Sequence, residues 1–252
     1  MALSRAVHLF VWQWILLSLG AFVTGLSKTG IAGLGVLAVA LFANALPARA
    51  STGALLPLLL AGDVFGVAFF RKHANWPLLL KLFPWVVAGV LAGFFALDRI
   101  SNAQVQHLIG GVLLTMVGLQ LWRQRQNNQA AAALPHTWWF AALTGILAGF
   151  TTMVANAAGP VMVLYFLAVG LPKLAFVGTG AWFYMLVNAF KVPFSVRLGL
   201  IHPDSLLVDA ALLLPMVPGA LLGPVVLHRM DQRVFEIVAP VLTVVAAVRL
   251  LL

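Results

Sequence analysis

Residues 25–30 read Gly-Leu-Ser-Lys-Thr-Gly and interrupt an apolar stretch that otherwise continues from residue 10 to residue 46. A membrane-spanning helix needs roughly 20 apolar residues, because it rises about 1.5 Å per residue through a hydrocarbon core about 30 Å thick. The apolar segments on either side of the break, 10–25 and 31–46, are both shorter than that. The break therefore predicts a pair of short or re-entrant helices with polar residues between them.

The composition of the chain places it in a lipid bilayer. Of its 252 residues, 63% are hydrophobic and 8% are charged, whereas a soluble domain has roughly 45–50% apolar and about 25% charged residues. Soluble enzymes and nucleic-acid-binding proteins are therefore excluded. The net charge of +9 reflects membrane topology, because basic residues gather at cytoplasmic helix ends. The chain has no cysteine, so it has neither disulfides nor thiolate metal ligands, and we expect no metal and no cofactor.

The hydropathy pattern divides the chain into ten apolar segments. Six are long enough to cross the membrane, and the four short ones form two pairs, each around a polar break at 27–30 or at 151–156. The segments are apolar on all sides instead of alternating, which excludes transmembrane strands and predicts an all-α polytopic membrane protein. The ten segments are residues 10–25, 31–46, 51–70, 77–97, 104–122, 138–153, 157–171, 174–194, 206–227 and 234–252.

An internal repeat is indicated by residues that recur at a fixed spacing. Pro172 lies 125 residues after Pro47, and Asn188 lies 125 residues after Asp63. Further along the chain the spacing becomes 130 residues, where the Gly-x-x-x-Gly pattern that begins at Gly89 returns. The chain therefore reads as two copies of five segments.

Five segments are an odd number, so the second copy is expected to lie upside down relative to the first, as in inverted-repeat transporters. Both termini then lie on one face, and the basic residues favour the external face. The predicted parts are a first repeat over residues 1–122, a linker over 123–136 and a second repeat over 137–252, all within one transmembrane domain.

The two polar breaks carry the residues of a central anion site. Ser27, Lys28, Thr29 and Gly30 combine one cation, two hydroxyl donors and the expected start of the next short helix, whose free N–H groups attract anions. The alternative is that Lys28 extends to the membrane interface while the glycines serve helix packing. The second break adds uncharged donors, Thr152 and Asn156 among them.

A carboxylate lies in the middle of a predicted span. Asp63 is surrounded by apolar residues, and an unpaired charge at that depth costs roughly 2.5–3.5 kcal/mol. It is therefore expected to pair with Lys28 or Lys191, to bond Asn188, or to titrate as a coupling group. Arg71 and His73 follow the same segment and are further candidates for coupling or ion pairing, although a loop position is more typical of such a histidine.

Several motifs in both halves carry a resemblance to a known family. They are Gly25-Leu-Ser-Lys-Thr-Gly30, Gly33, Gly35, Asp63-Val-Phe-Gly66, Arg71-Lys-His73 and Trp76, and then Gly149-Phe-Thr-Thr152, Asn156, Gly159-Pro160, Leu171-Pro-Lys173, Phe176, Gly178-Thr179, Asn188, Lys191 and Pro193. In these residues the chain resembles the sulfite exporter TauE/SafE family, also described as toluene-sulfonate uptake permeases. The family pattern often has His at the position of Asn156.

The resemblance implies a multi-pass permease that moves sulfite, sulfoacetate or another small organosulfonate outward across a bacterial inner membrane. It extends the candidate substrate-binding residues to Thr179, Asn188 and Lys191. The expected partners are the lipid bilayer and the small anion, and a homodimer is left open. Two other functions use the same residues: a passive anion channel, and an intramembrane hydrolase with Ser27 as nucleophile and Lys28 as base.

Overall fold

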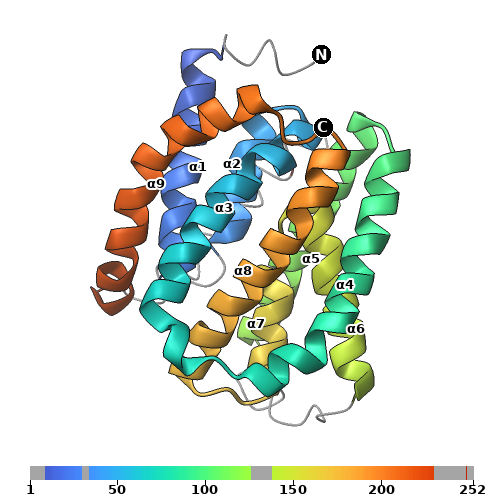
Figure 1. Ribbon diagram of the computed structural model, residues 1–252, viewed down its shortest axis with the longest axis vertical. Helices are drawn as coiled ribbons and strands as arrows, with labels where there is room; N and C mark the ends of the chain where they lie inside the picture. Colours follow the sequence, from blue (N-terminus) through green and yellow to red (C-terminus); the bar gives the residue numbers. More distant parts are fainter. Residues whose placement is uncertain (1–8, 30–33, 126–137, 230–247, 249–252) are drawn as a thin grey trace.

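The described part of the chain is built from α-helices. The computed structural model describes residues 9–29, 34–125, 138–229 and 248, and no strand occurs among them. Helices follow one another along these ranges with short turns between them (Figure 1). They are α1 (Val11–Thr29), α2 (Gly35–Ala45), α3 (Ala48–Phe70), the 3-10 turn η2 (Arg71–His73), α4 (Trp76–Arg99), α5 (Asn102–Arg125), α6 (Trp138–Ala155), α7 (Gly159–Ala168), α8 (Lys173–Arg197) and α9 (Pro203–Arg229).

Nine of the ten apolar segments predicted from the sequence are helices in this part of the chain. The tenth, residues 234–252, lies outside the described residues apart from Val248. α2 and α7 have 11 and 10 residues, so both are short, and each is five residues shorter than the predicted segments 31–46 and 157–171. α1 is longer than predicted, because helical hydrogen bonding continues through Ser27, Lys28 and Thr29. The expected start of the next short helix falls in residues 30–33, outside the described residues.

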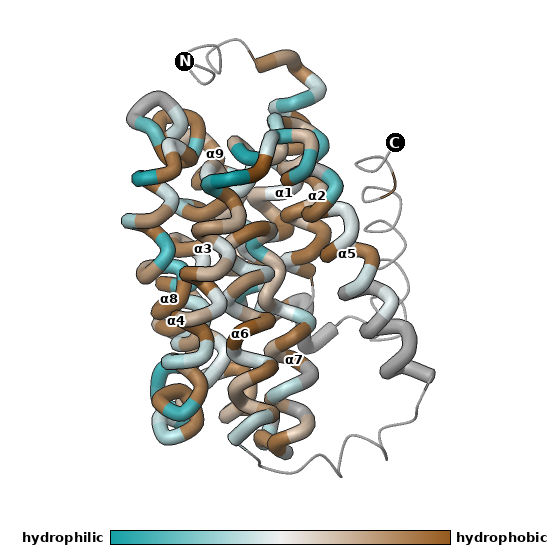
Figure 2. The backbone as a smooth tube through the Cα atoms, turned by 90° about the vertical axis from the view of Figure 1, so that its right-hand side faces the viewer, coloured by the Kyte–Doolittle hydropathy of each residue, from teal (hydrophilic) through white to brown (hydrophobic). Residues whose placement is uncertain are grey.

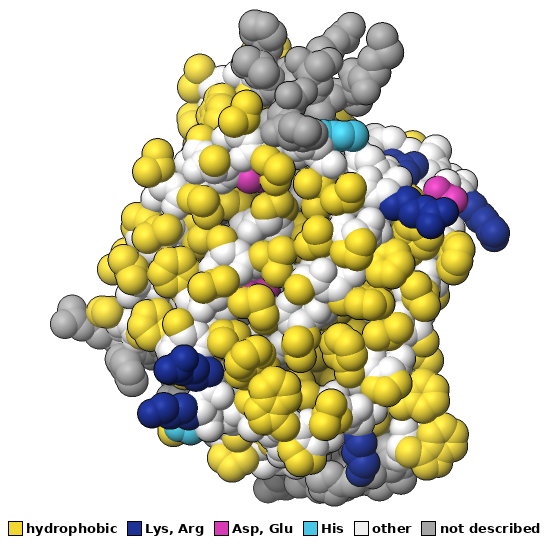
Figure 3. Space-filling view, viewed as in Figure 1, with side chains coloured by type: hydrophobic (Ala, Val, Ile, Leu, Met, Phe, Trp, Pro, Cys, Tyr) yellow, Lys and Arg dark blue, Asp and Glu magenta, His cyan; other side chains and the backbone are white. Residues whose placement is uncertain are grey.

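Four described stretches are long and apolar enough to cross a membrane. They are Ala48–His73, Trp76–Arg99, Trp138–Ala155 and Ser205–Val225. Hydrophobic residues follow the helices along most of their length (Figure 2). In the space-filling view, hydrophobic side chains cover the middle of the visible face, and Lys and Arg lie toward its ends (Figure 3). This is the distribution expected where the middle of a protein faces lipid and its ends face water.

The helices are arranged as two outer pairs around a central pair. α1 and α9 lie side by side at one edge of the molecule, and α4 and α6 lie side by side at the opposite edge. α3 and α8 pack against each other between these outer pairs (Figure 1). Helices from both halves of the sequence therefore meet at each of these three contacts.

The two outer pairs are held by the same kind of glycine contact. A Cβ added at Gly25 of α1 would collide with the carbonyl oxygen of Met216 in α9. A Cβ added at Gly149 of α6 would collide with the carbonyl oxygen of Val86 in α4. Glycine lets helix backbones approach closely in a membrane. Gly149 lies 124 residues after Gly25, and Met216 lies 130 residues after Val86, so the two contacts have nearly the spacing of the sequence repeat.

Candidate functional site

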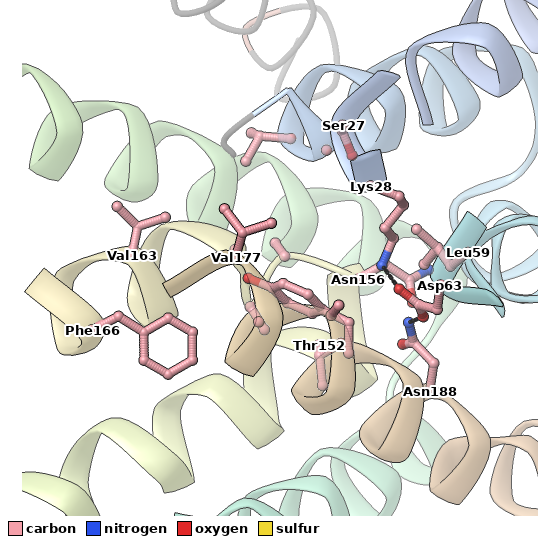
Figure 4. Close-up of a pocket in the computed structure, with 18 of the residues that line it drawn as sticks. Ser27, Lys28, Leu59, Asp63, Thr152, Asn156, Val163, Phe166, Val177 and Asn188 are labelled. Atoms are coloured by element: carbon pink, nitrogen blue, oxygen red, sulfur yellow. Dashed lines mark hydrogen bonds and ion pairs between the residues drawn. The ribbon is translucent and has the colours of Figure 1, made fainter. Parts of the chain in front are cut away.

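A cavity of about 110 Å³ lies between α1, α2, α3, α6, α7 and α8. Its polar wall is formed by Ser27, Lys28, Asp63, Thr152, Asn156, Tyr184 and Asn188, and its apolar wall by Val36, Leu59, Val163, Phe166, Phe176 and Val177. In the close-up, Val163, Phe166 and Val177 lie on one side, whereas Lys28, Asp63 and Asn188 meet on the other (Figure 4). The cavity is therefore amphipathic and lies where the two polar breaks meet.

Lys28 and Asp63 form an ion pair beside the cavity. The distance from Lys28 Nζ to Asp63 Oδ1 is 2.6 Å, and the side chains are 10% and 1% exposed. Lys28 lies in the last turn of α1, where the negative end of the helix dipole favours a cation. α3 makes room for it with glycines: a Cβ at Gly62 would lie 2.9 Å from Cγ of Lys28, and one at Gly66 would lie 2.9 Å from its carbonyl oxygen.

An aromatic ring also faces the ammonium group. Lys28 Nζ lies 4.6 Å from the centroid of the Tyr184 ring of α8. A cation at this distance from a ring face is stabilised by the ring quadrupole. Lys28 is therefore held by residues of α3 and α8, the two helices that pack together at the centre.

Asn188 of α8 connects two charges of opposite sign. Its Nδ2 donates to Asp63 Oδ2 at 2.7 Å, and its Oδ1 accepts from Lys191 Nζ at 3.4 Å. An amide has one donor end and one acceptor end, so each end faces the charge that suits it. We call Lys28, Asp63, Asn188 and Lys191 the polar network.

Lys191 lies on the far side of Asn188 from Asp63. Its side chain is 1% exposed, and its Nζ donates to Asn156 Oδ1 at 2.6 Å and to Thr152 Oγ1 at 3.1 Å. Together with Asn188 these oxygens provide three acceptors for the three donors of an ammonium group. All three acceptors are uncharged, so Lys191 has hydrogen-bond partners but no counter-ion among the described residues.

Asn156 ends α6 and fixes the second polar break. Its φ is 51°, in the left-handed region that asparagine tolerates better than most residues. Its Nδ2 donates to the carbonyl oxygen of Thr52 in α3 at 2.9 Å, while its Oδ1 accepts from Lys191. The turn after α6 is thereby tied to helices of both halves.

The polar network has one more basic side chain than acidic side chains. It contains two ammonium groups, Lys28 and Lys191, and one carboxylate, Asp63. An uncompensated buried charge is costly in a low-dielectric environment. With all three groups ionised, the polar network carries one formal positive charge in excess.

Comparison with known families identifies the chain. The family model described as Sulfite exporter TauE/SafE matches residues 17–250, which includes both halves of the sequence. The chain belongs to the sulfite exporter TauE/SafE family. Comparisons with curated proteins and with solved structures found no match. The resemblance seen in the sequence is confirmed, and the chain is a multi-pass membrane protein from a family of transporters of the sulfite and organosulfonate type.

In this TauE/SafE member, the structure brings most of the candidate site residues together. Six of the candidate residues line the cavity: Ser27, Lys28, Asp63, Thr152, Asn156 and Asn188. Lys191 does not line it, but its ammonium group donates to Thr152, Asn156 and Asn188. Of the partners that the sequence left open for Asp63, the structure has Lys28 as the ion-pair partner and Asn188 as the hydrogen-bond partner.

Two candidate threonines have structural partners instead of lining the cavity. Thr29 is fully buried, and its Oγ1 donates to the carbonyl oxygen of Ala220 in α9 at 2.7 Å. Thr179 is also fully buried, and its Oγ1 accepts from the backbone N–H of Asn75 at 2.9 Å. Thr29 thus joins α1 to α9, and Thr179 holds the turn between η2 and α4 against α8.

The remaining candidates lie away from the cavity or outside the described residues. Arg71 and His73 are exposed in η2, and the carbonyl oxygen of Arg71 accepts from the indole of Trp182 at 3.4 Å. Gly30 lies outside the described residues. Within the described ranges, no three His, Asp or Glu side chains are placed to hold a metal ion.

Sequence reasoning missed two residues of interest. Tyr184 faces Lys28, and the signal for it was its position four residues before Asn188, on the same face of a helix. Asp209 of α9 is 4% exposed, and neither of its carboxylate oxygens has a hydrogen-bond partner among the described residues. Its presence in a predicted apolar segment was the signal, although it does not line the cavity.

Proposed function

We propose that the chain is a carrier that exports a small organosulfonate or sulfite anion across a bacterial inner membrane. The observation that carries this proposal is the excess positive charge of the polar network beside the cavity. A sulfonate offers three acceptor oxygens and one negative charge, which suit an ammonium group and hydroxyl donors. The Thr152 hydroxyl accepts from Lys191, so its own hydrogen is available to an anion.

The apolar wall favours a substrate with an organic group. Val163, Phe166 and Val177 line the part of the cavity that lies away from the Lys28–Asp63 pair (Figure 4). An inorganic oxyanion has no apolar surface to bury there, whereas each buried CH₂ group of an organosulfonate contributes about 0.8 kcal/mol. A monoanionic organosulfonate therefore suits both walls better than sulfite does.

Binding of the anion involves an exchange of partners at Lys28. The ammonium is paired with Asp63 in the structure, and a sulfonate in the cavity competes for it. Asn188 remains to bond Asp63, and Lys191 supplies positive charge one residue further along the polar network. The polar network can therefore take up an anion without leaving the carboxylate wholly unpartnered.

The proposed transport cycle is alternating access between two inverted repeats. The matching glycine contacts of Gly25 and Gly149 support it, because they relate α1 and α9 to α6 and α4 by nearly the spacing of the sequence repeat. The bond between Asp63 and Asn188 supports it as well, because the predicted sequence repeat pairs these two residues at a spacing of 125. Substrate sites of such carriers lie at the interface between the repeats.

The two alternative functions are less well supported. A hydrolase needs Lys28 as a free base for Ser27, but the Lys28 ammonium is 2.6 Å from Asp63. A passive channel would use the same cavity and the same charges. It differs from a carrier in transport kinetics, because a carrier shows counterflow: with the membrane potential clamped, a gradient of unlabelled anion drives labelled anion against its own gradient.

Anion binding to the purified protein tests the proposal. A ligand that binds the folded state raises its stability by mass action, so thermal unfolding in detergent is followed with benzenesulfonate, methanesulfonate, sulfite, sulfate, taurine and chloride. We expect benzenesulfonate to give the largest shift and chloride to give little. A series led by chloride or by a cation would contradict the substrate class, and the absence of counterflow in proteoliposomes would favour the channel.

A further inference from the structure

A second hollow lies on the molecule, well away from the polar network. It is a groove of about 90 Å³ between α4, α6 and α7, and Lys81, Trp85, Trp138 and Tyr165 are among its lining residues. None of its lining residues also lines the central cavity. α4 and α6 both begin at the end of the molecule where this groove lies (Figure 1).

The polar groups of this groove are almost all hydrogen-bond donors. Lys81 contributes an ammonium group, and Trp85 and Trp138 contribute indole N–H groups, none of which can accept a hydrogen bond. In the part of the chain that the structure describes, Lys81, Trp85, Trp138 and Tyr165 make no side-chain hydrogen bond and no ion pair. No carboxylate lines the groove. A ligand with anionic acceptor oxygens would satisfy these donors.

The remaining surface of the groove is apolar. Leu78, Phe140 and Val169 complete its walls, and the rings of Trp85 and Trp138 lie with their centroids 6.4 Å apart. The fitting ligand is therefore an amphiphile, with an anionic group at Lys81 and apolar chains along the rings.

The position of the groove in the membrane identifies the class of amphiphile. α4 and α6 are candidate membrane spans that begin at Trp76 and Trp138. Lys81 lies five residues into α4, which is about 8 Å along the helix axis at about 1.5 Å per residue. Lysine and tryptophan at this depth lie at the boundary between headgroups and acyl chains. We propose that the groove binds one anionic phospholipid, with its phosphate on Lys81 and an acyl chain between α4 and α7.

Lipid retention by the purified full-length protein tests this proposal. Native mass spectrometry is recorded after incubation with phosphatidylglycerol or with phosphatidylcholine, and Lys81→Gln is compared with Lys72→Gln. Lys72 is an exposed lysine of η2, a few residues before α4, and it does not line the groove. We expect the unchanged protein and the Lys72→Gln variant to retain one phosphatidylglycerol that Lys81→Gln binds about tenfold more weakly, since a charged hydrogen bond of about 1.5 kcal/mol is lost.

Two further measurements test whether the indole of Trp138 contacts the ligand and whether the ligand is a lipid. Trp138→Phe keeps an aromatic side chain, although a smaller one, and removes the indole donor, and we expect it to weaken phosphatidylglycerol retention while the fold is preserved. Glycerol phosphate, which has the headgroup charge without acyl chains, should not displace the lipid. Equal retention of phosphatidylcholine, unchanged retention in Lys81→Gln, or displacement by glycerol phosphate would each overturn the proposal.

Discussion

Asp63 and Asn188 are 125 residues apart in the sequence, and their side chains are joined by a hydrogen bond of 2.7 Å. Each lies on the central helix of its half, α3 or α8, and each has a lysine beside it. The bond therefore links the two cations of the polar network through one carboxylate and one amide.

Replacing Lys28 should remove both a substrate contact and the partner of a buried carboxylate. We expect Lys28→Ala to lower the free energy of unfolding by roughly 3–5 kcal/mol, because it leaves Asp63 without its counter-ion. The double variant Lys28→Ala with Asp63→Asn should recover much of that stability without recovering anion binding. Thermal unfolding with and without benzenesulfonate measures both effects. Full anion binding by the double variant would show that Lys28 is not a substrate contact.

Replacing Asn188 by aspartate should cancel the excess charge of the polar network. The new carboxylate would lie between Lys191 and Asp63, whose Oδ2 is now 2.7 Å from the amide nitrogen. Its negative charge would repel an anion in the adjoining cavity, since like unit charges about 4 Å apart repel by about 4 kcal/mol at an effective dielectric constant near 20. We expect benzenesulfonate affinity to fall more than tenfold in calorimetric titration. Asn102→Asp, the same change at an exposed residue of α5, is the matched control and should bind as the unchanged protein does.

Alanine at the contact glycines should destabilise the outer helix pairs. Gly25→Ala and Gly149→Ala each place a methyl group against a neighbouring backbone, and overpacking typically costs 1–3 kcal/mol. Gly111 of α5 is a control, because nothing lies within 4 Å of a Cβ added there. We expect Gly111→Ala to be neutral or stabilising by roughly 0.5–1 kcal/mol. Unfolding temperatures in one detergent decide the comparison, and equal effects at all three glycines would argue against the close contacts.

Single cysteines test the proposed inversion of the repeats. The chain has no native cysteine, so substitutions at residues 2, 128 and 252 can be labelled one at a time in intact cells. We expect residues 2 and 252 to be labelled from one side of the membrane and residue 128 from the other, because an odd number of crossings separates them. Labelling of residue 128 from the same side as either terminus would rule out an inverted arrangement.

The helices could be predicted from the sequence because hydropathy depends on composition over a whole segment. The end of α1 could not, because the Thr29 hydroxyl there donates to the carbonyl oxygen of Ala220, a residue 191 positions away. The hydropathy of a segment does not depend on such contacts with distant residues.

The choice of partner for Asp63 also depended on tertiary structure. The sequence offered Lys28 and Lys191, and the two are equivalent as charges. Gly62 makes room for Lys28 beside Asp63, whereas Thr152 and Asn156 hold Lys191 behind Asn188. Tyr184 was missed for a related reason, because nothing in an apolar segment indicates which ring will face a cation.

The way in which the cations are partnered bears on how the chain is made. Lys28 meets Asp63 within the first half, and Lys191 meets Thr152, Asn156 and Asn188 within the second. Each half therefore emerges from the ribosome with the partners of its own buried ammonium already encoded. We therefore expect each half to enter the bilayer with a hydrogen-bonding partner for its own lysine, and the bond between Asp63 and Asn188 to form once both halves are present.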